Sequence, residues 1–266
     1  MKNMIFTEEN IYQGNLVLIN RDFPICDALY DLSAAVNKYP DIKLQKHVSA
    51  KLQKLISVLK CDEKIIPVSG YRSSQEQVRI YYDSIIENGE DFTEKFVALP
   101  DHSEHQSGLA IDLALKKDSV DFICPDFPDS GICGKFRKLA PLYGFILRYP
   151  KGKENVTCIS HEPWHFRYTG YHHSQIIEEK GFTLEEYMDF IKQYTKYKSF
   201  LYEDNLNITE IFYLPLDNDK EAKLSLPDNC SFQVSGNNMD GIIVTVFHNS
   251  KPNKYAAENQ FSYSPA

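Results

Sequence analysis

The amino-acid sequence predicts an α+β fold, in which a small, mainly antiparallel sheet flanked by helices precedes a small all-β C-terminal appendage. Two observations support this prediction. Up to about residue 199, segments with the apolar spacing of helices alternate with short apolar runs of strand length. From Thr209 onward only short β-type runs remain, separated by turn residues such as Asp217-Asn218. We therefore divide the chain into a main domain, residues 1–199, and an appendage, residues 200–266.

The first quarter of the chain has one predicted helix and two short strands. Residues 1–25 form an irregular arm in which only Leu16–Ile19 is typical of a strand. In Val48–Leu59, apolar residues recur every three to four positions, and this spacing predicts a helix. Ile65–Val68 is a short apolar run followed by a Ser-Gly pair, which indicates a buried strand that enters a turn.

The next segment combines a helix with the most regular predicted strand. Ser73 or Ser74 can cap a helix that continues to about Asn88, where a glycine follows. Residues 92–100 are expected to form a connector with a short extended piece. In Leu109–Leu115 large apolar residues alternate with smaller or polar ones, and this period of two predicts a strand with one apolar face.

The rest of the main domain is predicted to hold two helices and two strands. Residues 116–133 are polar and rich in Asp and Pro, which favours a loop. Phe136–Tyr143 has helical spacing and ends before a glycine. Phe145–Tyr149 and Trp164–Tyr168 are typical of strands. A capping box begins a helix over residues 183–198.

Four strands are predicted in the appendage, and each is bounded by Pro, Gly, Asn or Asp. They span residues 211–214, 223–226, 232–234 and 242–247. The last residues, from Pro252 onward, are expected to form a frayed tail. The pattern indicates no role for the appendage.

The composition favours a globular chain and argues against two kinds of partner. Hydrophobic residues make up 42% of the sequence, enough for a packed core. A net charge of -8 argues against nucleic acid and against a polybasic membrane attachment, since both need clustered Lys and Arg. No apolar run approaches the ~18 residues of a membrane span, and the N-terminus lacks the apolar core of a secretory signal. We therefore expect a cytoplasmic chain without a membrane anchor.

The cysteines fit a reducing compartment. None of the six forms a CxxC pair, so a cysteine zinc site is not expected. Cytosolic thiols stay reduced, and we predict six free thiols. Cys124 and Cys133 form the only local pair that would be worth testing for a disulfide.

One stretch, residues 101–115 (DHSEHQSGLAIDLAL), contains two candidate metal ligands. His105 and Asp112 are seven residues apart, across a turn that contains a glycine. Imidazole nitrogen and carboxylate oxygen both bind zinc, and a catalytic zinc needs three protein ligands and one open position. The best third candidate is His165, in the HEPWHFRY of residues 161–168. The three residues together predict one catalytic zinc ion per chain.

Polar residues near these ligands could complete a hydrolytic site. Zinc lowers the pKa of a bound water to about 7, but a base must still take its proton. Glu162 lies three residues before His165 and could be that base. Arg72, at a strand-to-helix turn, could stabilise the oxyanion that forms on a scissile carbonyl. Gln77 and Ser103 could hold a peptide end. Spacing alone leaves a structural role open for each of these side chains.

Three ordered blocks of sequence resemble a known enzyme family. They are SGYRSSQEQ (69–77), SEHQSGLAIDL (103–113) and EPWHFRY (162–168). The blocks match the patterns SGYRSxxxQ, SxHxxGxAxD and ExWH of the M15 family of zinc D,D-peptidases, the VanX/VanY group. Connecting segments such as YGFILRYP are most similar to the bifunctional VanXY type of vancomycin-resistance enzyme. The resemblance covers roughly residues 10–198.

The resemblance implies a role for each matched residue. The residues that match the zinc ligands are His105, Asp112 and His165. Glu162 matches the catalytic base, and Arg72 matches the arginine that stabilises the transition state. The residues that match substrate-binding or pocket-wall positions are Ser103, Gln77, Tyr71 and Trp164.

The implied reaction is hydrolysis of D-Ala-D-Ala, or removal of the C-terminal D-alanine from a cytoplasmic muramyl pentapeptide precursor. Loss of these precursors would leave less target for glycopeptide antibiotics such as vancomycin. VanY-type enzymes commonly have an N-terminal membrane anchor, and the absence of one here favours the VanXY type. The balance of the two activities, the fate of D-Ala-D-Ser and D-Ala-D-Lac ends, and the oligomeric state stay open.

Two alternatives remain. An L,D-carboxypeptidase or cell-wall endopeptidase of the same family would share the metal chemistry and differ only in its pocket loops. A zinc-containing peptidoglycan-binding module without catalysis would belong to another class. Glu162 and Arg72 argue against that module, because binding alone needs neither a base nor an oxyanion donor.

Overall fold

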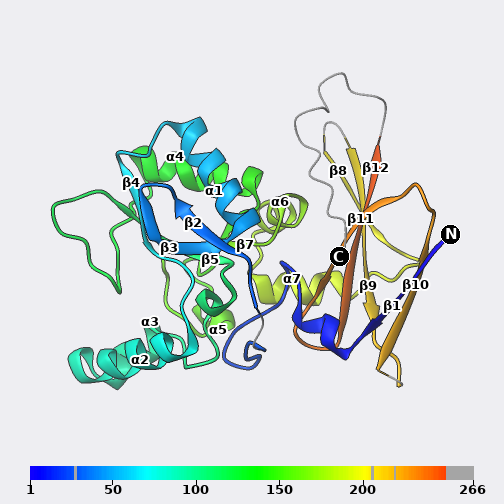
Figure 1. Ribbon diagram of the computed structural model, residues 1–266, viewed down its shortest axis with the longest axis horizontal. Coiled ribbons are helices and arrows are strands. Elements are labelled where there is room, and N and C mark those ends of the chain that lie inside the picture. The colour runs from blue at the N-terminus through cyan, green and yellow to red at the C-terminus, as the bar shows by residue number, and fades with distance from the viewer. Residues whose placement is uncertain (27–28, 205–206, 219, 250–266) are drawn as a thin grey trace.

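A computed structural model describes residues 1–26, 29–204, 207–218 and 220–249. Figure 1 shows two adjoining parts, a mixed α/β part on the left and a β part on the right, with α7 (Leu184–Ile191) between them. Small antiparallel sheets flanked by helices, followed by C-terminal strands, confirm the predicted α+β class.

The main part is built on a four-stranded antiparallel sheet in the order β4-β5-β7-β6. Its strands are β4 (Ile65–Ser69), β5 (Ala110–Leu115), β7 (His165–Tyr168) and β6 (Phe145–Leu147). All four lie within or close to runs that the sequence predicts as strands. On central strand β5, Ile111 and Leu113 are fully buried and point into the main apolar core. The other face of β5 is therefore free to present Asp112.

Helices cover this sheet and surround its edges. They are α1 (Lys46–Leu59), α2 (Ser74–Asn88), α3 (Glu90–Phe96), α4 (Gly131–Leu139), α5 (Glu154–Thr157) and α6 (Tyr171–Lys180). Short 3-10 helices are η1 (Glu8–Tyr12), η2 (Glu104–Ser107) and η3 (Ala140–Tyr143). Helix α1 places Val48, Leu52 and Leu55 in the main core, as its apolar spacing predicts. Ser73 caps α2 by accepting a hydrogen bond from the Glu76 amide.

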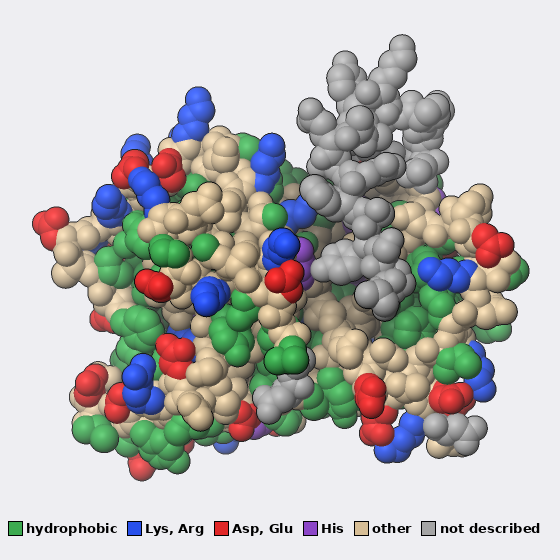
Figure 2. Space-filling view, in the orientation of Figure 1, with side chains coloured by type: hydrophobic (Ala, Val, Ile, Leu, Met, Phe, Trp, Pro, Cys, Tyr) green, Lys and Arg blue, Asp and Glu red, His purple; other side chains and the backbone are tan. Residues whose placement is uncertain are grey.

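Helix α2 lies at the edge of the molecule and is only partly covered. Apolar side chains gather at the lower left of the space-filling view, over the region of α2 and α3 (Figure 2). The exposed large apolar residues of α2 are Val78, Tyr82 and Ile86. Its opposite side packs against α3, where Ser84 and Thr93 share a buried hydrogen bond of 2.8 Å.

Several sequence predictions in the main part are wrong. Leu16–Ile19 is buried but is not a strand, because its backbone does not pair with a neighbouring strand. Instead, the Leu18 amide donates to the Asn237 carbonyl in a loop, and the Arg167 side chain donates to the Val17 carbonyl. The connector at 92–100 begins with helix α3, in which Phe92 and Phe96 pack one turn apart.

Other differences concern elements that are missing from the prediction or shorter than predicted. The hairpin of β2 (Leu32–Val36) and β3 (Tyr39–Gln45) and helix α6 are absent from it. Helix α4 begins earlier than predicted, within the expected loop, and α7 ends at Ile191 rather than at 198. Cys124 and Cys133 are both free thiols.

The β part contains a four-stranded antiparallel sheet, β11-β12-β9-β8, and a two-stranded sheet, β1-β10. Its strands are β1 (Lys2–Thr7), β8 (Phe200–Glu203), β9 (Asn207–Pro215), β10 (Glu221–Leu226), β11 (Ser231–Gly236) and β12 (Gly241–Asn249). The four predicted strands all fall inside β9 to β12. The division at residue 200 stays a prediction, although the N-terminal strand β1 pairs with β10. The tail predicted from Pro252 lies outside the described residues.

A second apolar core joins the two parts. It brings Leu16 and Leu18 of the N-terminal arm together with α6, α7 and the appendage residues Ile211, Tyr213 and Ile243. His173 of α6 crosses this junction, because one ring nitrogen bonds the Tyr187 hydroxyl at 2.6 Å and the other the Thr245 hydroxyl at 3.0 Å. None of the helices in the described ranges is long and apolar enough to cross a membrane.

Candidate metal centre

The three predicted ligands meet at one point on the sheet. Asp112 of β5 and His165 of β7 are directly paired neighbours in the antiparallel register, and His105 comes from η2 just before β5. Their ligand atoms all lie within 4.8 Å of one another, and all three residues are buried. Two imidazoles and one carboxylate form a donor set that suits zinc and leaves a position open.

The turn between His105 and Asp112 explains the glycine in this motif. Gly108 ends η2 with φ +68, in the left-handed region that glycine adopts without strain. The chain reverses there into β5. Asp112 Oδ2 lies 3.1 Å from His105 Nε2, and Asp112 Oδ1 lies 3.0 Å from His165 Nδ1. The carboxylate thus bridges the two rings, and each ring turns one nitrogen toward the same point.

A backbone carbonyl orients the first ring. His105 Nδ1 lies 2.7 Å from the Gly70 carbonyl oxygen, so Nδ1 carries the proton that it donates, and Nε2 keeps its lone pair for a metal. Only glycine fits at this position, because the chain at Gly70 runs close to β3 and a Cβ there would lie 2.3 Å from the Lys43 carbonyl oxygen. The glycine of the SGYRS block therefore serves the ligand geometry.

The electrostatics of the site favour a cation. Burial, together with nearby Arg72, lowers the pKa of His105 to about 4, so this ring is neutral at pH 7. Burial would also lower the pKa of His165, but the Asp112 carboxylate outweighs it and raises this pKa to about 9. Burial likewise opposes the charge on Asp112, yet the two histidines hold its pKa well below the usual value. Asp112 Oδ1 is buried, and although His165 Nδ1 lies 3.0 Å away, the two atoms do not have the geometry of a hydrogen bond, so this oxygen accepts none from the described residues. An anionic oxygen in this position fits a metal ion.

Glu162 lies beside the ligands. Its Oε2 is 3.6 Å from His165 Nδ1, and its backbone amide donates to the Tyr149 carbonyl. The residue is 4% exposed. Burial raises the pKa of Glu162 to about 8, and the Asp112 carboxylate adds to this effect. The side chain is therefore a proton-binding group within reach of the ligand atoms.

Arg72 lies on the other side of Asp112. Its Nε donates to Ser69 Oγ at 2.8 Å and its Nη2 to Asp112 Oδ2 at 3.1 Å. Gln77 accepts a longer bond, of 3.4 Å, from Nη1 and donates to the Ala98 carbonyl. The guanidinium is thus fixed at the edge of the metal centre, as an oxyanion donor requires.

A cavity opens beside these residues. Among the predicted site residues it is lined by Arg72, Ser103, His105, Asp112, Glu162, Trp164 and His165. Gln77 and Tyr71 are not in this lining: Gln77 is buried behind Arg72, and Tyr71 is half-buried with its amide bonded to the Lys43 carbonyl. Their substrate-binding roles stay predictions.

The structure adds residues that the sequence does not single out. Phe122 and Tyr149 line the cavity, and the Arg72 guanidinium lies 5.7 Å from the centre of the Phe122 ring. Glu104, directly before His105, is almost fully buried. A buried glutamate is uncommon. The sequence around position 104 is equally typical of a solvent-exposed glutamate, so it gives no signal that Glu104 is buried.

The chain is similar to known D-alanyl-D-alanine peptidases both in sequence and in fold. A sequence model of the VanY family, described as D-alanyl-D-alanine carboxypeptidase, matches residues 41–171. The bifunctional D-Ala-D-Ala dipeptidase and carboxypeptidase VanXYC of Enterococcus gallinarum is 48% identical over 154 residues, which cover 58% of this chain and 81% of that protein. A D-alanyl-D-alanine carboxypeptidase of Enterococcus faecium is 37% identical over 260 residues, 92% of this chain and 78% of that one.

The fold comparison covers nearly the whole chain. The crystal structure of the vancomycin-resistance D,D-dipeptidase VanXYg, in complex with a D-Ala-D-Ala phosphinate analogue, superposes with a TM-score of 0.91 at 49% identity. The match covers 93% of this chain and 99% of that chain, so it extends beyond the main part into the β part.

Proposed function

Because this chain belongs to the VanY family of D-alanyl-D-alanine carboxypeptidases, within the M15 zinc D,D-peptidases, we propose that His105, Asp112 and His165 hold one zinc ion per chain. The observation that supports this most is the convergence of the three ligand atoms within 4.8 Å. Members of this family are zinc metallopeptidases, and this chain is therefore a zinc metallopeptidase as well. The assignment of individual residues is our proposal.

The proposed substrates are the D-Ala-D-Ala dipeptide and the C-terminal D-alanine of pentapeptide peptidoglycan precursors. The relative at 48% identity is named as a bifunctional D-Ala-D-Ala dipeptidase and carboxypeptidase. The solved structure at 49% identity is that of a D,D-dipeptidase. Both reactions break an amide bond next to a terminal D-alanine. By analogy, the activity would contribute to vancomycin resistance. A cytoplasmic location, expected from the sequence, remains part of this proposal.

When bound, zinc would polarise the scissile carbonyl and make water a nucleophile near neutral pH. Glu162 would take the proton from the attacking water and pass it to the leaving amine. Its position 3.6 Å from His165 Nδ1 supports this role. A buried carboxyl binds a proton readily, and a nearby divalent cation favours its charged form, so the group can accept and return a proton at neutral pH.

Arg72 would stabilise the negative charge that develops on the scissile carbonyl oxygen. Its guanidinium is fixed by Ser69 and Asp112 before substrate arrives, so little reorganisation is needed in the transition state. Ser103, which lines the same cavity, would donate a hydrogen bond to the terminal carboxylate of the substrate. Trp164 would form an apolar wall for the D-alanine methyl group.

The test is hydrolysis by the zinc-loaded protein. D-Ala-D-Ala, a muramyl pentapeptide that ends in D-Ala-D-Ala, and the tetrapeptide product are supplied separately, and released D-alanine is measured. We expect release from the first two substrates and none from the tetrapeptide, whose terminal bond is L,D. Release from the tetrapeptide alone would show an L,D-carboxypeptidase and overturn the proposed specificity.

A further inference from the structure

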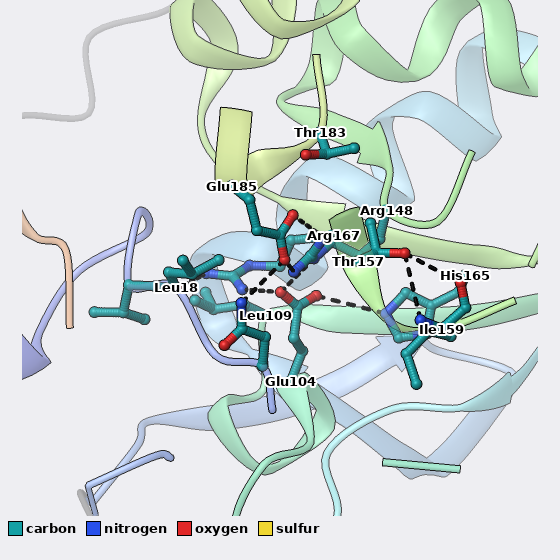
Figure 3. A network of polar contacts seen from close by, with 12 residues as sticks. Leu18, Glu104, Leu109, Arg148, Thr157, Ile159, His165, Arg167, Thr183 and Glu185 are labelled. Carbon is teal, nitrogen blue, oxygen red and sulfur yellow. Dashed lines mark hydrogen bonds and ion pairs between the residues drawn. The ribbon is translucent and has the colours of Figure 1, made fainter. Parts of the chain in front are cut away.

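Glu104 lies at the centre of a buried ion-pair network behind the metal centre (Figure 3). Its side chain has no solvent exposure. Arg148 Nε donates to Glu104 Oε1 at 2.7 Å, and Arg167 Nη1 donates to the same oxygen at 2.6 Å. The other oxygen, Oε2, faces the outer nitrogen of His165, 3.6 Å from Nε2. The carboxylate is therefore shared between two arginines on one oxygen and a proposed zinc ligand on the other.

The arginines leave Oε2 free for this histidine. Arg148 directs its two terminal nitrogens to Glu185 of α7, at 2.9 and 2.6 Å. Arg167 directs its remaining nitrogens to backbone carbonyls, among them Val17 at 2.7 Å. Over the described part of the chain, neither Glu104 Oε2 nor His165 Nε2 has another hydrogen-bond partner. These two atoms face each other at 3.6 Å, slightly beyond normal hydrogen-bond distance, and no other described polar group bonds to either of them.

The geometry of His165 determines which nitrogen has to carry the proton. Its Nδ1 is the nitrogen that faces Asp112 and Glu162, at 3.0 and 3.6 Å, so Nδ1 is the atom available to a metal. A neutral imidazole that binds a metal through Nδ1 carries its proton on Nε2. That N–H points into a buried region where Glu104 Oε2 is the facing acceptor.

We propose that Glu104 is a positioning residue for the metal centre, which accepts a hydrogen bond from the Nε2–H of His165 and so holds Nδ1 toward the zinc. The proposal rests on the assignment of His165 as a zinc ligand. The two histidine ligands would then be oriented differently: His105 by the Gly70 carbonyl, and His165 by a carboxylate. A carboxylate partner also makes the ring a more basic, stronger ligand.

A purely structural role for Glu104 makes a different prediction. In that case Glu104 serves only to neutralise Arg148 and Arg167, and its loss would weaken the metal-free fold without changing the affinity for zinc. Glu185 provides the matched control, because it is a partly buried carboxylate that also bonds to Arg148 but makes no hydrogen bond or ion pair with His165 among the described residues.

The test compares the wild-type chain with the variants Glu104→Gln and Glu185→Gln. A glutamine at 104 has one acceptor oxygen, which the two arginines would keep, so its NH2 group would face the Nε2–H of His165. The zinc dissociation constant is measured by competition with a chromophoric chelator, and thermal unfolding of the metal-free proteins is measured in parallel. We expect Glu104→Gln to weaken zinc binding about 10- to 100-fold. Glu185→Gln should lower the unfolding temperature and leave the dissociation constant unchanged.

A second measurement needs no variant and covers the case in which Glu104→Gln does not fold. In zinc-loaded wild-type protein with 15N-labelled histidine, NMR should show His165 bound through Nδ1, with a hydrogen-bonded proton on Nε2. A metal-bound Nε2, or equal zinc affinity in wild type and Glu104→Gln, would overturn the inference while the proposed function stands. A wild-type chain that binds no zinc would overturn the proposed function itself.

Discussion

The substitution Arg72→Lys tests the proposed oxyanion donor, because it keeps the positive charge and removes the planar guanidinium. In the structure this group donates to Ser69 Oγ at 2.8 Å, to Gln77 Oε1 at 3.4 Å and to Asp112 Oδ2 at 3.1 Å. A lysine ammonium cannot reproduce these bonds, because its donors diverge from a single atom. We therefore expect the variant to bind zinc but to stabilise the transition state poorly.

The expected loss follows from the role of a fixed donor beside a developing oxyanion. Removal of one such donor costs about 2.7–4 kcal/mol, which corresponds to roughly 100- to 1000-fold in kcat. The Arg72 side chain is only 11% exposed, so water cannot readily take its place. We expect kcat for D-Ala-D-Ala to fall by this factor and KM to change less, since the interaction strengthens mainly in the transition state.

The assay is steady-state release of D-alanine by wild-type and variant proteins with equal zinc content. Arg79→Lys is the matched control, because Arg79 is an exposed arginine on helix α2, which begins just after Arg72, and it does not line the cavity. It should leave both kinetic constants unchanged. An Arg72→Lys enzyme with wild-type kcat at full zinc occupancy would refute the proposed role of the guanidinium.

Two further predictions concern the base and the appendage. Glu162→Ala should keep its zinc, since Glu162 is not a proposed ligand, and lose about 10²- to 10⁴-fold in kcat as general-base catalysis disappears; elemental analysis and turnover measure both, and undiminished turnover would contradict the mechanism. Deletion of residues 200–266 should prevent stable folding of the remainder. It removes Ile211, Tyr213 and Ile243 from the shared core, at about 1.5–3 kcal/mol for each buried apolar side chain, against a total stability of about 5–15 kcal/mol. A cooperative thermal transition in the truncated chain, with unchanged hydrolysis, would show that the appendage is dispensable.

The parts of the fold that the sequence predicts well have strong local patterns. Strand β5 and helix α1 each bury apolar side chains in a single core. The resulting alternation in β5 and three-to-four spacing in α1 can therefore be read from a short stretch of sequence. Helix α6 has only two buried apolar residues, Ile176 and Ile177, which are adjacent, and it packs against the appendage. Its sequence therefore has no helical period. Strand β1 depends on pairing with β10, more than 200 residues away, and local patterns do not show such pairing.

The same reasoning applies to the metal centre. The motifs identify His105, Asp112 and His165 because a catalytic zinc demands particular residue types, and the structure brings all three together. Glu104 has no such signature. Its environment depends on Arg148 and Arg167, which are distant in sequence, and only the fold shows that a charged residue at this position is buried.

The zinc content of the purified chain tests the central claim most directly. Elemental analysis is made of the wild type, of His165→Ala and of His248→Ala, a matched control on β12 whose ring is exposed and pairs with Glu210. We predict about one zinc per chain in the wild type and in the control, and little or none in His165→Ala. One zinc per chain retained in His165→Ala would contradict the proposed metal centre.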